Sequence, residues 1–158
     1  MNRKKPSNRK TPPKRRPSKG KTQSKSAKKK ELIKALLRAP VTGIRFKGET
    51  ITFNFMGRRI ADRILLKREV HVAEWSRRRK QIFIDRNISG FGRENSFRAL
   101  CVHEAVEKFL AETYGLTVDN EAHVVATRKE REFLEKNGGN WRSHELVVYW
   151  DWHFLGEK

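Results

Sequence analysis

A histidine and a glutamate lie one helical turn apart in the segment "RALCVHEAVEKFLAETYGL", which spans residues 98–116. They are His103 and Glu107, and a projection at about 100° per residue places both within an arc of leucine, valine and phenylalanine side chains. A buried carboxylate that lacks a partner is strongly destabilising, so such a group forms an ion pair, becomes protonated or binds a metal. The sequence therefore predicts an internal partner for both residues.

The segment "EAHVVATRKE" (residues 121–130) repeats this pattern two turns along one helix face, with His123 and Glu130 inside an apolar arc. Two imidazoles and two carboxylates that face each other can surround one divalent cation. Imidazole and carboxylate ligands suit Zn²⁺, and also Fe²⁺ or Mn²⁺. We therefore predict a metal site formed by His103, Glu107, His123 and Glu130, with zinc favoured. From the residues alone, the alternative is a hydrogen-bonded His–Glu network without a metal.

The other side chains that could ligate or react fit structural roles better. Cys101 is the single cysteine, which excludes an internal disulfide and favours a small buried or half-buried thiol. His71, His144 and His153 are expected to pack or to lie at the surface. The tryptophans near the C-terminus are expected to pack rather than to stack on bases.

Two consecutive helices must position the predicted ligands. The first is predicted over residues 96–114 and ends at Gly115, a residue suited to the left-handed position after a helix. The second is predicted to begin near Thr117 or Asp119 and to end at Lys136, before the break "NGG" at 137–139. The tryptophan-rich segment after this break is expected to form a lid or a strap over the body.

The residues before these helices predict a small sheet. "GIRFKGETITFNFMG" (43–57) alternates apolar and polar residues around "KGET", which is typical of a β-hairpin. "QIFID" (81–85) is a compact apolar strand, Val70 and Val72 suggest a short one, and 59–66 is ambiguous. A short helix is predicted over 29–39. This order of elements predicts an α+β domain, with an antiparallel or mixed sheet packed on the two helices.

The positive charge is concentrated at the N-terminus. Residues 1–30 contain 14 of the 37 lysines and arginines and no acidic residue, so the formal charge of +19 is mostly theirs. Because this segment has no aromatic or branched aliphatic residue to bury, we predict a disordered arm over 1–30 and a single domain over 31–158. Such an arm favours contact with DNA, RNA or a ribonucleoprotein; a solubilising tail or an acidic membrane surface are the alternatives. The predicted nucleic-acid contacts are Arg3, Lys4, Lys5, Arg9, Lys10, Lys14, Arg15 and Arg16.

No apolar run approaches the ~20 residues needed to cross a bilayer, and no apolar segment follows the N-terminal charges as in a secretory signal. A cytoplasmic protein is therefore expected. The oligomeric state is left open by the sequence.

"VHEAVE" (102–107) resembles the His-Glu-x-x-His helix of zincin metallopeptidases, with "QIFID" placed like the edge strand that lines their substrate cleft. Further stretches resemble a family of small uncharacterised metallopeptidase-like proteins of phage and prokaryotic genomes. The resemblance covers roughly residues 56–150, excludes the arm and implies a minimal zincin-like fold. Its stretches are "MGRRIADRIL", "IFIDRNI", "ALCVHEAVEKFLAETYGL", "EAHVVATRKE" and the closing tryptophan-containing segment.

The resemblance implies that His103 and His123 are metal ligands and that Glu104 is the general base for an attacking water. Glu107 stands where a zincin has its second histidine, and Glu130 would complete the ligand shell. The implied activity is that of a metal-dependent, peptidase-like hydrolase acting on a peptide or protein. The alternative is a non-catalytic protein associated with nucleic acid or a ribonucleoprotein, in which the metal or the His–Glu network is structural.

Overall fold

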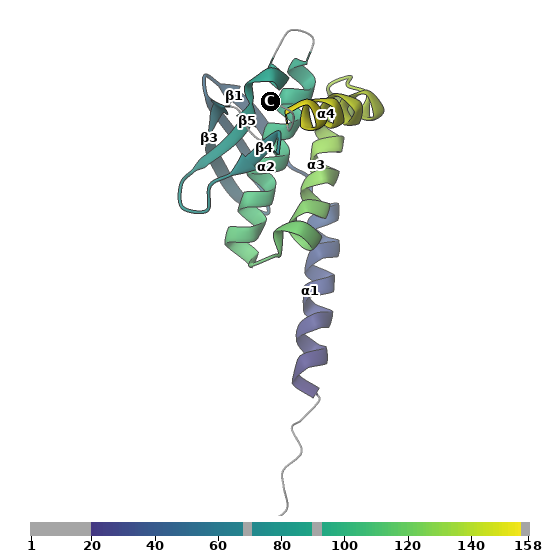
Figure 1. The fold of residues 1–158 in the computed structure, drawn as a ribbon. Coiled ribbons are helices and arrows are strands. Elements are labelled where there is room, and N and C mark those ends of the chain that lie inside the picture. Colours follow the sequence, from purple (N-terminus) through teal and green to yellow (C-terminus); the bar gives the residue numbers. More distant parts are fainter. Residues whose placement is uncertain (1–19, 68–70, 90–92, 156–158) are drawn as a thin grey trace, which may run out of the picture.

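A computed structural model of the chain describes residues 20–67, 71–89 and 93–155 (Figure 1). The predicted α+β class is confirmed. The helices are α1 (Gly20–Arg38), α2 (Glu94–Tyr114), α3 (His123–Lys136) and α4 (Trp141–Leu155), with a 3₁₀ turn at Arg86–Ser89 and a π turn at Val118–Ala122. The strands are β1 (Thr42–Lys47), β2 (Thr50–Phe55), β3 (Arg58–Lys67), β4 (Ala73–Trp75) and β5 (Gln81–Asp85).

The strands form one mixed sheet in the order β1-β2-β3-β5-β4. β1 and β2 form the predicted hairpin, and the ambiguous segment 59–66 belongs to β3, which is antiparallel to β2 and parallel to β5. The placement of "QIFID" at the edge of the sheet was wrong, because β5 lies between β3 and β4. The strand at that edge is β4, which starts one residue after Val72 and pairs antiparallel with β5, and β1 forms the other edge.

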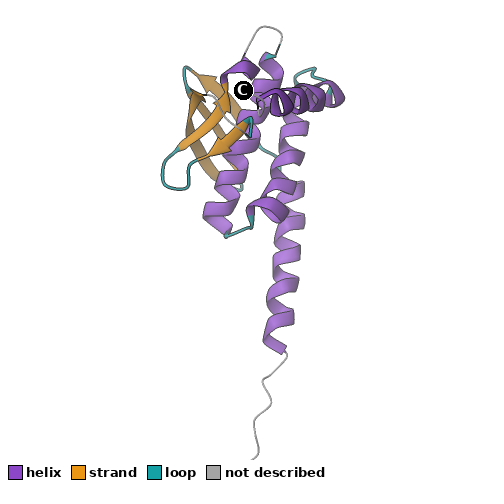
Figure 2. Cartoon of the chain, in the orientation of Figure 1, coloured by secondary structure: helices purple, strands orange, loops and turns teal. Residues whose placement is uncertain are grey.

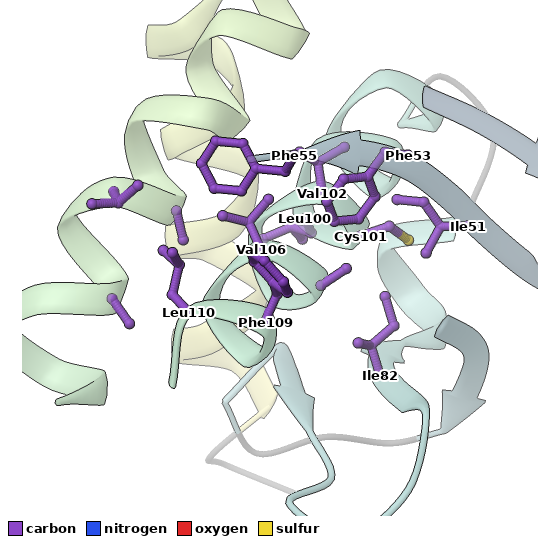
Figure 3. Packing of buried hydrophobic residues seen from close by; sticks show 14 of the residues in the cluster. Ile51, Phe53, Phe55, Ile82, Leu100, Cys101, Val102, Val106, Phe109 and Leu110 are labelled. Carbon is purple, nitrogen blue, oxygen red and sulfur yellow. The ribbon is translucent and has the colours of Figure 1, made fainter. Parts of the chain in front are cut away.

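Helix α2 lies between the sheet and α3, and the hydrophobic core surrounds it (Figures 2 and 3). Every residue from Ala99 to Leu110 is buried, whichever side of the helix it occupies. On the sheet side, the ring of Phe109 meets that of Phe55 edge-on, with the centroids 5.9 Å apart. Because the sheet covers one side of α2 and α3 covers the other, the polar residues of α2 contact protein on either side of the helix.

The two predicted central helices are confirmed, with small differences at their starts. Helix α2 begins at Glu94 and ends where expected, since Gly115 has a φ of 62° and its N–H donates to the carbonyl of Ala111. Helix α3 ends at Lys136, as predicted. The π turn precedes it, so regular α-helical structure starts at His123.

Helix α1 is longer than the predicted helix over 29–39. It starts at Gly20, so the expected boundary between arm and domain at residue 30 falls inside a helix. The lysines of residues 20–30 and Ala27 are good helix formers. Its C-terminal part is held by the fully buried Leu36 and by Lys129, whose Nζ donates to the carbonyl of Leu37 at 2.7 Å. The eight predicted nucleic-acid contacts of the arm lie outside the described residues.

The segment expected to be a lid or a strap is helix α4, which crosses the end of the molecule near α3 (Figure 1). Arg93 ties it to the start of α2, because the Nη1 of Arg93 donates to both carboxylate oxygens of Asp151 at 2.8–2.9 Å. Within the ranges that the structure describes, no helix combines the length and the apolar character needed to span a membrane.

Candidate metal centre

Three of the four predicted ligands bring one ligating atom each to a common point. The Nε2 of His103 lies 3.1 Å from the Nδ1 of His123 and 3.4 Å from the Oε2 of Glu107. The third side of this triangle, from the Nδ1 of His123 to the Oε2 of Glu107, measures 3.0 Å. His103 and Glu107 occupy successive turns of α2, and His123 is the first residue of α3.

This triangle has the dimensions of one face of a metal coordination shell. Bonds of about 2.0–2.1 Å to nitrogen and oxygen in a tetrahedral zinc site place neighbouring ligand atoms about 3.3–3.4 Å apart. The observed separations of 3.0–3.4 Å are close to that value. Among the described residues, His103, Glu107 and His123 form the one group of histidine, cysteine and acidic side chains that could hold a metal ion.

Glu130, the fourth predicted ligand, lies on the opposite side of the His103 ring. Its Oε2 is 2.8 Å from the Nδ1 of His103, and its Oε1 is 2.8 Å from the Nε2 of His144. A carboxylate on the far nitrogen of a ligating histidine fixes the orientation of the ring and increases its basicity. Glu130 therefore supports a ligand instead of joining the converging atoms.

The second carboxylate oxygen of Glu107, Oε1, accepts a hydrogen bond from outside the ligand triangle. The indole Nε1 of Trp75, on β4, donates to its Oε1 at 2.8 Å, which leaves Oε2 for the metal position. Burial raises the pKa of Glu107, but hydrogen bonds from His103, His123 and Trp75 overcome this effect and lower it to about 2. The carboxylate is therefore ionised and oriented before a cation arrives.

The two buried carboxylates also act on His103. Burial by itself lowers the pKa of this imidazole, but the charges and hydrogen bonds of Glu130 and Glu107 raise it well above its ordinary value. The pKa of Glu130, raised by burial, is lowered to about 2 by the charge and hydrogen bond of His103 and by His144. Since a metal binds neutral imidazole, a cation must displace a proton from His103.

Glu104, the predicted general base, is next to His103 on α2 and is 7% exposed. Burial raises its pKa to about 8, against the opposing charge of His103. Its carboxylate has no hydrogen-bond or ion-pair partner among the described residues, and it lines the same cleft as the three converging ligands. It is thus a buried acid that faces the cleft beside the three converging ligand atoms.

The prediction that His123 is buried was wrong. Its side chain is 54% exposed, because the residue lies at the start of α3, at the margin of the contact between α2 and α3. His123 therefore stands at the mouth of the site, whereas His103, Glu107 and Glu130 form its floor. An apolar arc on a helical wheel does not distinguish the interior of an interface from its margin.

The centre opens into a cleft of about 1110 Å³. It is lined by β4, α2, the π turn, α3 and α4, and α4 contributes Trp141, Val148, Tyr149 and Trp152. The size is sufficient for a chain of several residues, and the mixture of aromatic walls and convergent polar groups is typical of a binding site.

His144 was expected to have a packing or surface role, yet it connects α4 to the metal centre. Its side chain is 3% exposed, and its Nε2 meets the Oε1 of Glu130 at 2.8 Å. Its Nδ1 is the one fully buried side-chain nitrogen or oxygen without a hydrogen-bond partner in the part of the chain described here. The spacing Glu130–His144 crosses the break at 137–139, so no helical period could have related the two residues.

Comparisons of the chain with family models, with curated proteins and with solved structures found no match.

Proposed function

We propose that the protein is a metal-dependent hydrolase of peptide bonds, with zinc as the favoured metal and Glu104 as the general base. The observation that carries this proposal is the arrangement of three converging ligand atoms beside an unpartnered buried carboxylate. Catalytic zinc sites typically use three protein ligands, whereas structural sites use four. Because Glu130 lies behind His103, it leaves the centre with three ligands.

The edge strand supports a peptide as the substrate class. β4 pairs with β5 on one side and, among the described residues, with no strand on the other, so its outer backbone groups can pair with an extended chain. Trp75 links this strand to the centre, since its indole holds Glu107. A peptide paired along β4 would thus pass beside the ligands.

A divalent cation held by His103, Glu107 and His123 would polarise the scissile carbonyl and acidify water. In its ionised form, which becomes the major one above its pKa of about 8, Glu104 would take a proton from the attacking water as the water oxygen bonds to the carbonyl carbon. The same proton would then pass to the leaving nitrogen as the C–N bond breaks, giving one carboxylic acid and one amine. Glu130 and Trp75 would hold His103 and Glu107 in place throughout.

The test is cleavage of a mixture of dye-quenched peptides of random sequence by the full chain loaded with Zn²⁺. Glu104→Gln should retain the metal and lose about 10²–10⁴-fold in turnover, and His103→Ala should lose metal and turnover together. Glu94→Gln, an exposed acid in the first turn of α2, is the matched control. Equal turnover by wild type and Glu104→Gln, or no cleavage by zinc-loaded wild type, would refute the proposal.

A further inference from the structure

The outward face of the sheet carries cations and hydrogen-bond donors. Side chains that pair across strands lie on the same face, and the core residues of β2, namely Ile51, Phe53 and Phe55, face the helices. The alternate residues therefore face away from them, and Figure 2 shows the helices gathered on the other side of the sheet. We define the basic sheet face by its seven residues Arg45, Lys47, Thr50, Thr52, Asn54, Arg59 and Arg63.

The register arranges these residues in three parallel rows. Strand β2, which lies between β1 and β3, presents Thr50, Thr52 and Asn54, which have uncharged hydrogen-bonding side chains. On one side Arg45 of β1 pairs with Thr52, and Lys47 pairs with Thr50. On the other side Arg59 of β3 pairs with Asn54, and Arg63 pairs with Thr50. A row of donors thus lies between two rows of exposed cations.

The loop between β4 and β5 extends this charge. It contains the exposed Arg78, Arg79 and Lys80, and the N–H of Arg63 donates to the carbonyl of Lys80 at 2.8 Å. The loop therefore adjoins one end of the basic sheet face. Arg63 also donates to Glu49 at 2.8–3.1 Å, which places a carboxylate of the β1–β2 turn beside this face.

We propose that the basic sheet face binds the phosphate backbone of nucleic acid without reading its bases. Arginine, lysine, threonine and asparagine are the usual phosphate-contacting side chains. Strand geometry places Arg59 and Arg63 about 13 Å apart along β3, a length over which one nucleic-acid strand carries about four phosphates. This surface lies on the side of the sheet opposite α2, so it is independent of the metal centre and of the proposed hydrolysis.

The composition of the face favours nucleic acid over an anionic membrane. Membrane-surface binding combines basic residues with large apolar side chains that enter the lipid, and the seven residues of the face include none. Phe83, which also faces outward, is covered by the ammonium group of Lys67 at 4.0 Å from its ring centroid. With no exposed aromatic row for bases to stack on, the contacts should be mainly electrostatic.

The experiment is fluorescence anisotropy of a labelled 24-nucleotide random sequence, as duplex DNA and as single-stranded RNA, titrated with the full chain between about 50 and 200 mM salt. Replacing Arg45, Lys47, Arg59 and Arg63 by glutamine should make the slope of log Kd against log salt shallower by about one per cation, hence about four. The control has the same net charge and replaces four exposed helix cations by glutamine, namely Arg128, Arg131, Lys136 and Arg142.

Glu49→Gln should change binding in the opposite direction, because it releases Arg63 and removes a carboxylate that repels phosphate. Tighter binding by this variant and a shallower slope in the sheet variant but not in the control would support the proposal. Equal slopes in the sheet and control variants would overturn it, since net charge or the arm would then explain binding. Absence of wild-type binding at low salt would overturn it too, as would binding only to vesicles of phosphatidylserine.

Discussion

Glu107 and Glu130, the two buried carboxylates next to His103, make different contacts, although each follows a histidine on the same helix face. Glu107 turns one oxygen toward the ligand triangle, while Glu130 contacts the outer nitrogen of His103. The difference follows from where each residue lies relative to the His103 ring. Glu107 is one turn along the same helix, and Glu130 reaches the ring from α3.

The role of Glu130 predicts a graded loss of metal affinity. Glu130→Gln should weaken Zn²⁺ binding by about 10–100-fold, because an amide cannot hold the His103 ring as a carboxylate does. Competition with a chromophoric chelator measures this change. Glu135→Gln, an exposed acid on the same helix, should bind zinc like wild type. A complete loss of binding in Glu130→Gln would instead identify Glu130 as a direct ligand.

A second buried charge pair lies between the sheet and α2. Asp62 of β3 is 3% exposed, and its Oδ1 is 3.7 Å from the Nζ of Lys108, which also pairs with Glu112 at 2.7 Å. Burial raises the pKa of Asp62, and the charge of Lys108 offsets only part of this effect.

This raised pKa predicts a pH dependence of stability. A carboxyl whose pKa is higher in the folded state holds its proton more tightly there, so its contribution to stability falls as the pH rises from about 4 through the folded pKa. The variant Asp62→Asn has no carboxyl group at this position, so it does not lose stability in this way as the pH rises. In urea denaturation between about pH 4 and 7, the free energy of unfolding of the variant minus that of wild type should increase with pH. A constant or falling difference would contradict the raised pKa.

For single residues, the sequence predicted which side chains come together, but not how exposed each one is or which side of the His103 ring it contacts. His103, Glu107 and His123 converge as expected, because helical periodicity fixes the direction of side chains on one helix. The exposure of His123 and the position of Glu130 depend on how α3 packs against α2, which periodicity does not describe. His144 of α4, which contacts Glu130, had no pattern that could connect it to that residue.

At the scale of elements, α4 is attached to the body by polar contacts as well as by packing. The buried bond between His144 and Glu130 holds its first turns, and the ion pair between Arg93 and Asp151 holds its end. Leu146, Tyr149, Trp150 and Trp152 of the same helix are each more than half exposed. The docking of α4 therefore relies on a few specific bonds.

Removing the buried bond should loosen the wall of the cleft. His144→Ala leaves the Oε1 of Glu130 without its partner, so we expect the free energy of unfolding to fall by about 1–3 kcal/mol. Urea denaturation followed by tryptophan fluorescence measures this. His153→Ala removes an exposed imidazole from the same helix and should change stability by less than about 0.5 kcal/mol. Equal effects of the two changes would show that His144 does not anchor the helix.

At the scale of the whole molecule, the candidate metal centre spans the two central helices. His103 and Glu107 belong to α2 and His123 belongs to α3, so a cation held by these residues would link the two helices. A ligand that binds only the folded state stabilises it by an amount set by its concentration relative to Kd.

Zinc should therefore stabilise the full chain. At a free Zn²⁺ concentration about 100 times Kd, the free energy of unfolding should rise by about 2.7 kcal/mol relative to chelator-treated protein. Thermal and urea denaturation with and without zinc test this. Glu104→Gln should gain as much as wild type, whereas His103→Ala should gain nothing. Stabilisation of His103→Ala by zinc would place the binding site elsewhere.

The charges of the molecule are unevenly distributed. Cations gather on the outward sheet face, in the β4–β5 loop and in the predicted arm, while the cleft is lined by carboxyl groups from five elements, among them Glu74, Asp119 and Glu145. Contact of the arm with nucleic acid stays a prediction. If the arm and the basic sheet face both bind phosphate, replacing the cations of both should make the slope of log Kd against log salt shallower than replacing the cations of either one alone.

By itself, the sequence determined the class of the fold, most element boundaries and the pairing of histidine with glutamate on two helices. These follow from local periodicity, turn residues and the instability of unpaired buried charge, which act within a few residues. Only the tertiary structure decided that β4 is the edge strand, that α2 is buried on all sides and that Glu130 supports His103. Only it placed His144 against Glu130 and joined Arg45, Lys47, Arg59 and Arg63 into one face. Those relations depend on strand order and helix packing, which bring together residues that no local pattern connects.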